Sequence, residues 1–581
     1  MKNGRNFEYV SGEDPVLGAA MAPQIVAGIN KNVMSIAKHY IVNNQETHRS
    51  GVNELVDERT LMELYGPPFR AAVQHASGVM CAYNRINGVY ACENELTQMT
   101  MLKGRYGFAG FIVSDWGATH STVPALQAGL DIQMPNDSFF NNGTLAAAVA
   151  AGNITAARVD DSCVRILTGW YAVPAARRYP CTDAATGSAI CIGANVTSAA
   201  HKDLAKRIAS LSTVLLKNEG GVLPLSATPS APLAIALIGT DADDAYTAGG
   251  GSGSVKTNDM VSPLAAFSQV AADSNGMITV TYTKGAHVDD AVAAAAAADV
   301  AFVFGSAHTS EGSDRKSLNL EANVDALIPA VGAACKKTVV ALSVPGSILT
   351  DWRDSAAAIL WLGLPGEKVG PALADVVFGA VPPQAKLPVT LPKVDNEQNM
   401  TATQWPGVKT ANFDLQCKYS EGQFNGYRWY DQHDVAPAFP FGHGLTYGGA
   451  FEYGAVSVTK ASANSTSVTE SSQTNDQWTA SFTISRKATS AAGCDTPQLY
   501  FGYPSWGVDK AVPRKVLRNF QKVCHADPAQ DFAQVVSYTF GSEAIRSWDE
   551  GARAWGVVTG AFKVYVGTSS QAIKQTATFV V

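Results

Sequence analysis

The first 170 residues alternate short apolar runs with helical patterns, and polar side chains follow three of the runs directly. These polar residues are Lys38 with His39, Tyr83, and Asp115. In a parallel barrel the carboxyl ends of the strands converge on one face, so such side chains would line one pocket. The pattern therefore predicts parallel βα units with an active site at the strand ends.

The same region is long enough for only part of a barrel. Its strands are expected near residues 33–39, 78–83, 110–115 and 130–134. Helical patterns lie at 58–74 and, as one long helix, at 144–173. A complete eight-stranded barrel needs about 250 residues. We therefore expect a partial (β/α)8 TIM-type barrel over residues 1–173.

Three further regions follow. A stretch rich in Cys, Pro, Gly and Ser at 174–198 predicts a linker. Residues 199–395 predict an α/β sandwich around a mostly parallel sheet. Its expected strands are 233–238, 300–304, 338–342 and 358–362. Residues 396–447 predict an irregular, aromatic connecting segment, and the alternation with period two over 448–581 predicts an antiparallel β-sandwich.

Composition argues against several classes of function. The 43 basic and 50 acidic residues give a net charge of −7, and no basic aromatic stripe predicts a nucleic-acid partner. No apolar run is long enough to span a bilayer. The sequence has no motif of a zinc site, a zincin or an α/β-hydrolase. The Gly-rich run at 249–254 lacks the Gly-Lys-Ser/Thr ending of a P-loop, so nucleotide binding is not expected.

Two carboxylates fit glycoside hydrolysis. The retaining reaction uses a nucleophile and an acid/base about 5–5.5 Å apart. Asp115, at a strand end, suits the nucleophile. Glu311 lies in a small loop that can carry its carboxyl across a domain boundary, where a partly desolvated cleft would raise its pKa. A lone loop carboxylate is more often a solvated charge, but two that each follow a strand weaken that interpretation.

Several neighbouring side chains suit a sugar. Lys38, His39 and Arg49 can donate to vicinal hydroxyls, and Trp116 can stack on a pyranose face. Considered alone, Lys38 is better explained as an ion-pair partner and His39 as a buried core histidine.

Three cysteine pairs have spacings that allow disulfides. They are Cys81 with Cys92, Cys181 with Cys191, and Cys494 with Cys524. Free buried thiols explain the spacing nearly as well. Disulfides would indicate an oxidising compartment, and six Asn-x-Ser/Thr sequons point the same way.

The chain resembles the glycoside hydrolase family 3 β-glucosidases over its whole length. The similar motifs, in the family's order, are residues 3–8, 38–39 with 43–46, 80–84, 114–118, 310–312, 439–445 and 512–517. The resemblance implies a retaining mechanism in which Asp115 is the nucleophile and Glu311, from the second domain, is the acid/base.

The resemblance also implies a glucose subsite, without a metal or an organic cofactor. The residues that match it are Arg5, Lys38, His39, Arg49, Tyr83, Trp116 and Ser252. The tail at 448–581 would be a fibronectin type III-like domain, and Cys81–Cys92 a disulfide. An extracellular location is implied, and a homodimer is left open.

Three positions depart from patterns within the family. The family's barrel begins well before residues 3–5, so an N-terminally incomplete member is expected, without a subsite aspartate or a signal peptide. Ser313 stands where many fungal members carry an aromatic residue, which would leave the leaving-group side more open. Residues 40–44 lack the run that marks the branch acting on N-acetylglucosamine.

The predicted function is an exo-acting β-glucosidase that releases terminal glucose from β-glucosides or short β-glucans. Two alternatives remain. One is the same chemistry on β-xylosides. The other is a catalytically impaired carbohydrate-binding fragment, because missing barrel strands would leave the pocket incomplete.

Overall fold

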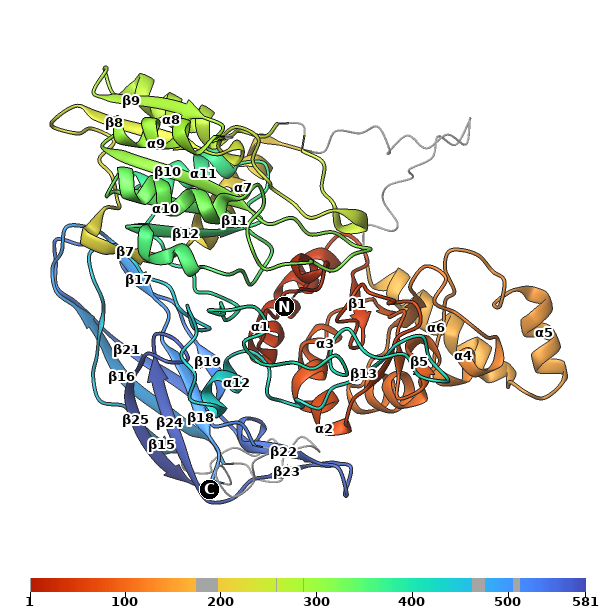
Figure 1. Ribbon diagram of the computed structural model, residues 1–581. Coiled ribbons are helices and arrows are strands. Elements are labelled where there is room, and N and C mark those ends of the chain that lie inside the picture. The colour runs from red at the N-terminus through yellow and green to blue at the C-terminus, as the bar shows by residue number, and fades with distance from the viewer. Residues whose placement is uncertain (1, 174–196, 258, 286, 462–475, 505–511) are drawn as a thin grey trace.

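The computed structural model describes residues 2–173, 197–257, 259–285, 287–461, 476–504 and 512–581. Three lobes surround the N-terminal segment (Figure 1): a red-to-orange first domain, a mainly green second domain and a blue β-sandwich. Nearly all of the predicted linker at 174–198 lies outside the described residues, and so do Cys181 and Cys191.

The first domain contains a three-stranded parallel sheet in the order β1-β3-β6. Its strands are β1 (Ile36–Tyr40), β3 (Gly78–Cys81) and β6 (Phe111–Ser114). Gly78 pairs with Ile36 on one side and with Phe111 on the other, so the predicted alternation is confirmed.

The prediction of a fourth strand in this domain, at 130–134, is wrong. Only one parallel bridge forms there, between Val113 and Ile132. Further along, the Ser114 hydroxyl accepts a hydrogen bond from the Met134 amide at 2.9 Å. A side chain thus takes an amide that a continuing strand would give to the backbone ladder.

The helices of the first domain confirm one prediction and correct another. The predicted helix at 58–74 is a continuous run of α2 (Glu58–Thr60), η2 (Leu61–Tyr65) and α3 (Gly66–Ala72). The single helix predicted at 144–173 is instead two, α5 (Asn142–Ala150) and α6 (Ala156–Ala172). Gly152 has φ +72, a conformation that ends a helix, and the Thr155 side chain caps α6.

Other helices complete this domain. They are α1 (Pro15–Asn30), η4 (Leu96–Arg105) and α4 (Val123–Ala128). The Asp14 carboxylate caps α1 by accepting from the amides of Val16 and Leu17. Helix α1 thereby begins directly after the segment that carries Arg5.

The second domain has a six-stranded sheet in the order β7-β12-β11-β10-β8-β9. Its strands are β7 (Val214–Asn218), β8 (Leu233–Ile238), β9 (Ile278–Thr283), β10 (Val300–Ser306), β11 (Thr338–Ser343) and β12 (Ala358–Gly363). Only β7 runs antiparallel to its neighbour, so the mostly parallel sheet is confirmed. The four predicted strands are present, and β7 and β9 at the two edges were not predicted.

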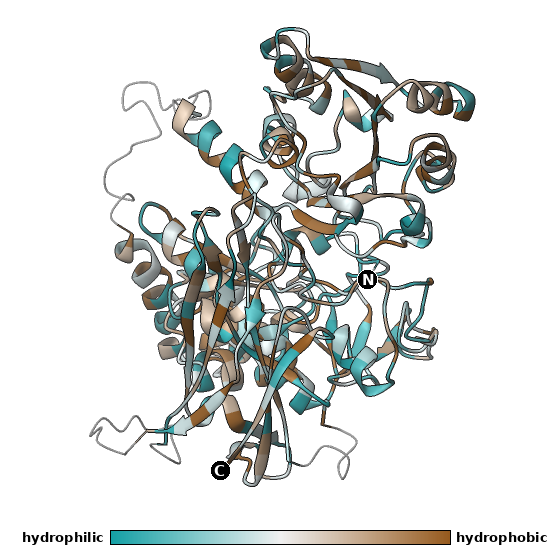
Figure 2. Cartoon of the chain, turned by 90° about the vertical axis from the view of Figure 1, so that its left-hand side faces the viewer, coloured by the Kyte–Doolittle hydropathy of each residue, from teal (hydrophilic) through white to brown (hydrophobic). Residues whose placement is uncertain are grey.

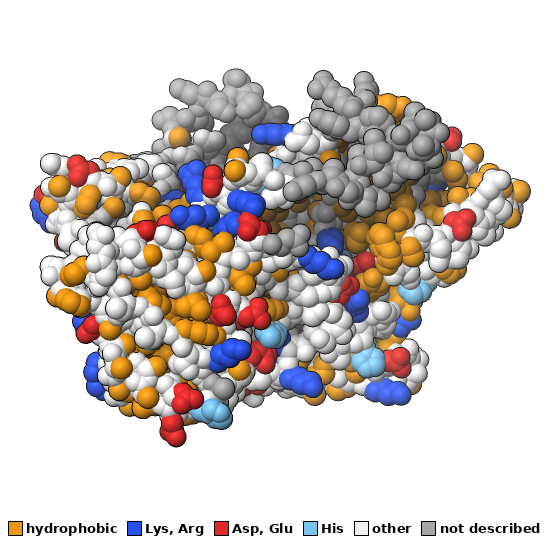
Figure 3. Space-filling view, turned by 90° about the horizontal axis from the view of Figure 1, so that it is seen from above, with side chains coloured by type: hydrophobic (Ala, Val, Ile, Leu, Met, Phe, Trp, Pro, Cys, Tyr) orange, Lys and Arg blue, Asp and Glu red, His pale blue; other side chains and the backbone are white. Residues whose placement is uncertain are grey.

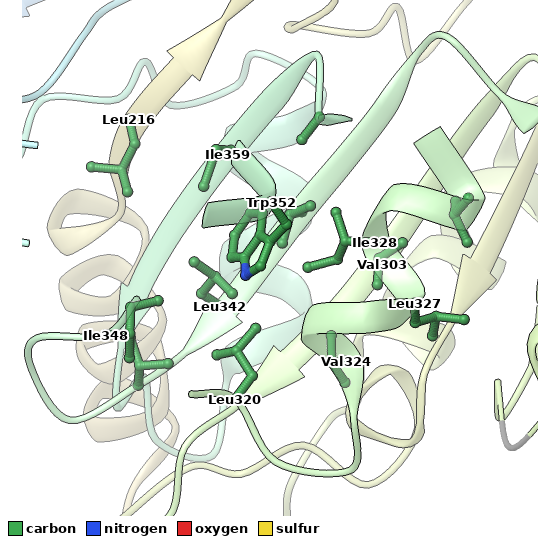
Figure 4. Close-up of a cluster of buried hydrophobic side chains, with 14 of the residues drawn as sticks. Leu216, Val303, Leu320, Val324, Leu327, Ile328, Leu342, Ile348, Trp352 and Ile359 are labelled. Atoms are coloured by element: carbon green, nitrogen blue, oxygen red, sulfur yellow. The ribbon is translucent and has the colours of Figure 1, made fainter. Parts of the chain in front are cut away.

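Helices cover the faces of this sheet (Figure 1). They are α7 (Ala199–Ser212), α8 (Pro263–Asp273), α9 (Val288–Ala296), α10 (Val324–Ala334) and α11 (Val369–Val377). Figure 4 shows Trp352 packed among Leu342 of the sheet and Ile328 of α10. The Trp352 indole donates to the Asp325 carboxylate at 2.6 Å, so the buried N–H is satisfied. This packing fixes the positions of the strands, and with them the points from which the loops at the strand ends begin.

The segment at 396–447 is more regular than predicted. Strand β13 (Gln416–Lys418) pairs in parallel with β2 (Asn53–Leu55) of the first domain. The sheet continues through β4 (Arg85–Ile86) and β5 (Val89–Tyr90). Helix α12 (Tyr427–Gln432) follows. Strands this short have no readable period, and β13 is defined by its partner in another domain.

The C-terminal region is a β-sandwich, as predicted. One sheet contains β14 (Glu452–Tyr453), β15 (Ser457–Lys460), β16 (Trp478–Arg486) and β21 (Phe532–Phe540). The other contains β18 (Gln498–Gly502), β19 (Val516–Phe520), β24 (Ala561–Gly567) and β25 (Ile573–Val580). Figure 2 shows hydrophobic and hydrophilic residues alternating along these strands, as expected when one face of each packs inward.

Two small two-stranded sheets complete the sandwich. β17 (Gly493–Asp495) and β20 (Val523–His525) are joined by the Cys494–Cys524 disulfide. The second sheet, a hairpin of β22 (Arg546–Asp549) with β23 (Ala554–Val557), reaches the first domain. There Trp548 is buried in the first-domain core, and its amide donates to Glu63 at 2.6 Å. The sandwich therefore supports the first domain directly.

Basic and acidic side chains are mixed over the face seen from above in Figure 3, without a broad field of one sign. None of the helices in the described ranges is both long and apolar enough to cross a membrane.

Candidate active site

The loop after β10 carries Glu311 from the second domain to the first. A parallel bridge joins Gly250 to Ser310, and the Glu311 amide donates to the Gly250 carbonyl at 3.3 Å. Gly251, at φ +83, lies so close that an added Cβ would be 2.3 Å from the Glu311 Cβ. The Gly-rich run therefore acts as the support of this loop, a packing role that only glycine allows.

The carboxylate of Asp314 fastens the same loop to the first domain. It accepts hydrogen bonds from the Gly4 amide at 3.3 Å and from the Glu46 amide at 2.9 Å. It also accepts from the amide and the hydroxyl of Thr47, at 3.0 and 2.6 Å. In return, the Glu46 carboxylate accepts from the Gly312 amide at 2.7 Å. We call this set of contacts the interdomain latch.

The Glu311 carboxylate is surrounded by donors. It accepts from the Ser252 amide at 2.7 Å and lies 3.2 Å from an Arg5 nitrogen and 2.9 Å from an Arg49 nitrogen. Burial raises the pKa of Glu311, but the Ser252 hydrogen bonds and the charges of Arg5 and Arg49 outweigh it and lower that pKa to about 2. Glu311 is thus ionised in the ligand-free protein.

Arg5 is itself held in place. Its Nε and Nη2 atoms donate to the two carboxylate oxygens of Glu8, both at 2.8 Å. Such a two-point pairing fixes the plane of the guanidinium. The remaining donors of the buried Arg5 side chain face Glu311 and the Ser252 hydroxyl, which lies 3.3 Å away.

Asp115 is buried where β6 ends. Its Oδ1 accepts from the Trp116 amide at 2.8 Å, and its own amide donates to the Cys81 carbonyl of the neighbouring strand at 3.2 Å. Its other oxygen lies 3.5 Å from His39 Nε2 and has no hydrogen-bond partner among the described residues.

His39 is buried and neutral. Burial and the charges of Arg5 and Lys38 lower its pKa to about 2. The Tyr9 hydroxyl hydrogen-bonds to Nδ1 at 2.8 Å, and Nε2 faces Asp115 without a hydrogen-bond partner in the described part of the chain. Buried polar atoms seldom lack partners, so the facing pair suits a polar ligand.

Tyr83 and Arg49 connect the two carboxylates. The Arg49 guanidinium lies 4.9 Å from the centre of the Tyr83 ring. Burial and then the charge of Asp115 raise the pKa of the Tyr83 hydroxyl, and Glu311 adds to the effect. Asp115 and Glu311 therefore act on the same side chains although they come from different domains.

Every residue predicted for the sugar site can be placed. Arg5 and Ser252 adjoin Glu311, His39 and Tyr83 adjoin Asp115, and Arg49 adjoins Tyr83 and Glu311. Lys38 is 38% exposed on its side chain, with its amine 3.7 Å from Glu8. The Trp116 side chain is 53% exposed, so its ring is open to solvent beside the buried Asp115.

Sequence reasoning missed four residues of this arrangement: Glu8, Tyr9, Glu46 and Asp314. Glu8 and Glu46 lie in runs that resemble the family, but their pairing with Arg5 and Arg49 depends on the fold. Asp314 follows Glu311 by three residues, yet its partners are more than 260 residues away in sequence. Nothing in the sequence indicates Tyr9.

The Cys81–Cys92 disulfide is present, with an S–S distance of 1.99 Å. It joins the end of β3 to the turn that follows β5, and the Cys81 carbonyl accepts the Asp115 amide. The expected pairing is therefore confirmed, and it lies directly beside the site.

Family models match most of the chain. The Glycosyl hydrolase family 3 N terminal domain matches residues 2–168, the C-terminal domain matches 213–447, and a Fibronectin type III-like domain matches 495–570.

Individual proteins agree with these matches. "Probable beta-glucosidase L" of Aspergillus terreus is 36% identical, over 100% of this chain and 81% of its own length. "Exo-alpha-(1->6)-L-arabinopyranosidase" of Bifidobacterium breve is 34% identical, over 99% and 73%. The crystal structure of beta-glucosidase D2-BGL from Chaetomella raphigera superposes with a TM-score of 0.85 at 32% identity, covering 100% and 83% of the two chains. The chain therefore belongs to glycosyl hydrolase family 3 and is a glycoside hydrolase.

Proposed function

We propose that this chain is a retaining, exo-acting β-glucosidase that releases terminal glucose from β-glucosides and short β-glucans. One observation carries the proposal: Asp115 at a strand end and Glu311 on a loop of another domain share the neighbours His39 and Tyr83. The similarity to fungal proteins named β-glucosidase supports glucose as the sugar.

In the proposed mechanism, an Asp115 carboxylate oxygen attacks the anomeric carbon while Glu311 protonates the glycosidic oxygen. The leaving group departs, and a glycosyl ester on Asp115 remains. Glu311 then removes a proton from water, whose oxygen attacks the anomeric carbon, breaks its bond to the Asp115 carboxylate and releases the sugar with retained configuration. The Trp116 amide, at Oδ1, keeps Asp115 oriented for attack.

The first step needs a proton on Glu311, whereas Arg5 and Arg49 keep that residue ionised in the free protein. A bound glucose would draw Arg5 and Arg49 donors to its hydroxyls and exclude water from the carboxylate. Both changes disfavour the charged form and raise the Glu311 pKa toward the working pH. His39 remains neutral, so it can hydrogen-bond a hydroxyl without adding positive charge beside Asp115.

The sugar itself is open to test, because a family member 34% identical is named for an arabinopyranoside. Hydrolysis of matched aryl β-glucosides and aryl β-xylosides separates the proposed glucosidase from a β-xylosidase. A higher kcat/KM for the glucoside supports the proposal. A higher kcat/KM for the xyloside would mean that the chain is a β-xylosidase instead.

The decisive variant is Asp115→Asn, compared with Asp137→Asn, which removes an exposed carboxylate of the same domain. We expect Asp115→Asn to lower kcat for an aryl β-glucoside by at least about a thousandfold with the fold retained. Asp137→Asn should behave as wild type. Wild-type turnover by Asp115→Asn would overturn the assignment, and binding of glucose without turnover by the wild-type chain would favour the carbohydrate-binding alternative.

We also propose an extracellular location. The Cys81–Cys92 and Cys494–Cys524 disulfides fit an oxidising compartment, where such bonds persist.

A further inference from the structure

A hollow of about 740 Å³ opens beside the loop that carries Glu311. The residues that line it include Gly312, Arg49, Arg85, Tyr90 and residues 409–414. Because Glu311 would protonate the glycosidic oxygen, the leaving group must lie on the Glu311 side of the sugar. The hollow therefore lies where an aglycone would extend.

Arg85 packs against two aromatic rings in this hollow. Its guanidinium carbon lies 4.2 Å from the centre of the Tyr90 ring and 5.1 Å from that of Phe413. Tyr90 in turn stacks on His120, with ring centres 3.6 Å apart. With rings against the guanidinium, its in-plane N–H groups are the donors left for a ligand.

Few of those donors are used within the chain. One Nη2 contact goes to the Tyr90 hydroxyl at 2.7 Å, and an arginine has five N–H donors. Neither Arg85 nor the exposed Lys409 forms an ion pair within the described ranges. Arg49, in contrast, is paired with Glu46 and Glu311.

Among the basic residues that line the hollow, Arg49 is therefore neutralised by carboxylates, whereas Arg85 and Lys409 pair with no described carboxylate. Two carboxylates, Glu46 and Asp414, line the same hollow. Glu46 is already bound by Arg49 and by the Gly312 amide, so Asp414 is the negative charge that faces Arg85 and Lys409 there.

We propose that this hollow is a leaving-group subsite for β-glucosides whose aromatic aglycone carries a carboxylate. Arg85 pairs with the carboxylate in the plane of its guanidinium, the edges of the Tyr90 and Phe413 rings contact the aromatic ring of the ligand, and Lys409 adds positive charge. The inference rests on the proposed glucosidase function and adds a preference for one class of leaving group.

The test compares 4-carboxyphenyl and 4-carbamoylphenyl β-glucosides, which have similar shape and differ in charge. The quantity measured is the ratio of their kcat/KM values in wild type and variants, so the difference in leaving-group reactivity cancels. We expect Arg85→Gln to lower the ratio on the order of fivefold, mainly through KM of the carboxylate. Lys409→Gln should lower it less, and added salt should reduce the wild-type ratio.

Two further variants sharpen the test. Asp414→Asn removes the repelling charge and should raise the ratio. Lys418→Gln, an exposed lysine that lines a different hollow, should leave it unchanged. Hydrolysis of both substrates with a ratio that Arg85→Gln and Lys409→Gln do not move overturns the inference alone. Failure of the wild type to hydrolyse either substrate overturns the proposed function and this subsite with it.

Discussion

The ionisation of Glu311 is set by two arginines and a loop amide. Arg5 is fixed by Glu8, whereas Arg49 is held by Glu46 and lies nearer to solvent, with 21% of its side chain exposed. Arg49 is therefore the partner that can be removed with less damage to packing.

We expect Arg49→Met to raise the Glu311 pKa, because it removes a positive charge that stabilises the carboxylate. If protonated Glu311 is the acid, the alkaline limb of the kcat profile, which reports the pKa in the substrate complex, must then move to higher pH. Profiles of wild type, Arg49→Met and the distant control Arg553→Met measure this. An alkaline limb that stays in place or moves to lower pH would contradict the assignment.

Gly251 gives a second test at this scale. A methyl group there would lie 2.3 Å from the Glu311 Cβ, so Gly251→Ala must displace the proposed acid/base. Misplacement of a catalytic group by about 1 Å can cost on the order of a hundredfold in rate, and we expect a loss of that size in kcat.

The matched control is Gly28→Ala, because no atom lies within 4 Å of a Cβ added at Gly28. Its kinetics should equal those of wild type. Equal kinetics in Gly251→Ala as well would mean that the Gly-rich run does not position Glu311.

The interdomain latch is the element that makes one site from two domains. Asp314 accepts four hydrogen bonds from Gly4, Glu46 and Thr47, and only in the docked arrangement can it receive them. Asp314 touches no reacting atom in the proposed mechanism, so it is a positioning residue for Glu311.

We expect Asp314→Ala to lower kcat by about tenfold or more, since the Glu311 loop loses its anchor, and Asp314→Asn to recover part of the loss. Steady-state kinetics together with thermal unfolding check this. The melting temperature should fall only slightly while kcat falls by about tenfold or more, and Asp137→Ala, the control, should change neither. A loss of stability that accounts for the whole loss of activity would show a merely structural role.

Elements with a strong local pattern could be predicted, and those defined by partners could not. β8 and β10 to β12 are long apolar runs, whereas β13 has three residues and exists through its pairing with β2. The break between α5 and α6 depends on Gly152 in a sequence that otherwise reads as helix. In the candidate site, the placement of Asp115 at a strand end and of Glu311 in a loop was predictable from the sequence pattern and the family motifs, and their catalytic roles stay predictions. The latch was not, because its partners meet only after the domains dock.

The whole molecule is joined by a buried polar network. Asp14, at the start of α1, pairs with Arg428 at 2.5 Å and accepts from the Tyr427 hydroxyl at 2.8 Å. Neighbouring Glu13 accepts from the Thr390 hydroxyl at 2.6 Å and from the Tyr427 amide at 2.8 Å. The first domain is thereby tied to the segment that leads into the sandwich.

Arg428→Met should therefore lower the free energy of unfolding by about 3–5 kcal/mol, because it leaves the Asp14 charge buried without its partner. Chemical denaturation compared with Arg553→Met, which breaks a partly exposed pair with Glu58, measures the difference. A change as small as that of the control would mean that the network contributes little to the stability of the assembled domains.

The most direct test of the whole account is chemical trapping of the sugar between the two domains. A 2-deoxy-2-fluoro-β-glucosyl fluoride reacts with a retaining nucleophile and leaves an ester that can be located by peptide mass spectrometry. The account predicts one adduct per chain, on the peptide that contains Asp115. An adduct on a different carboxylate, or binding of the sugar with no adduct, would contradict the account.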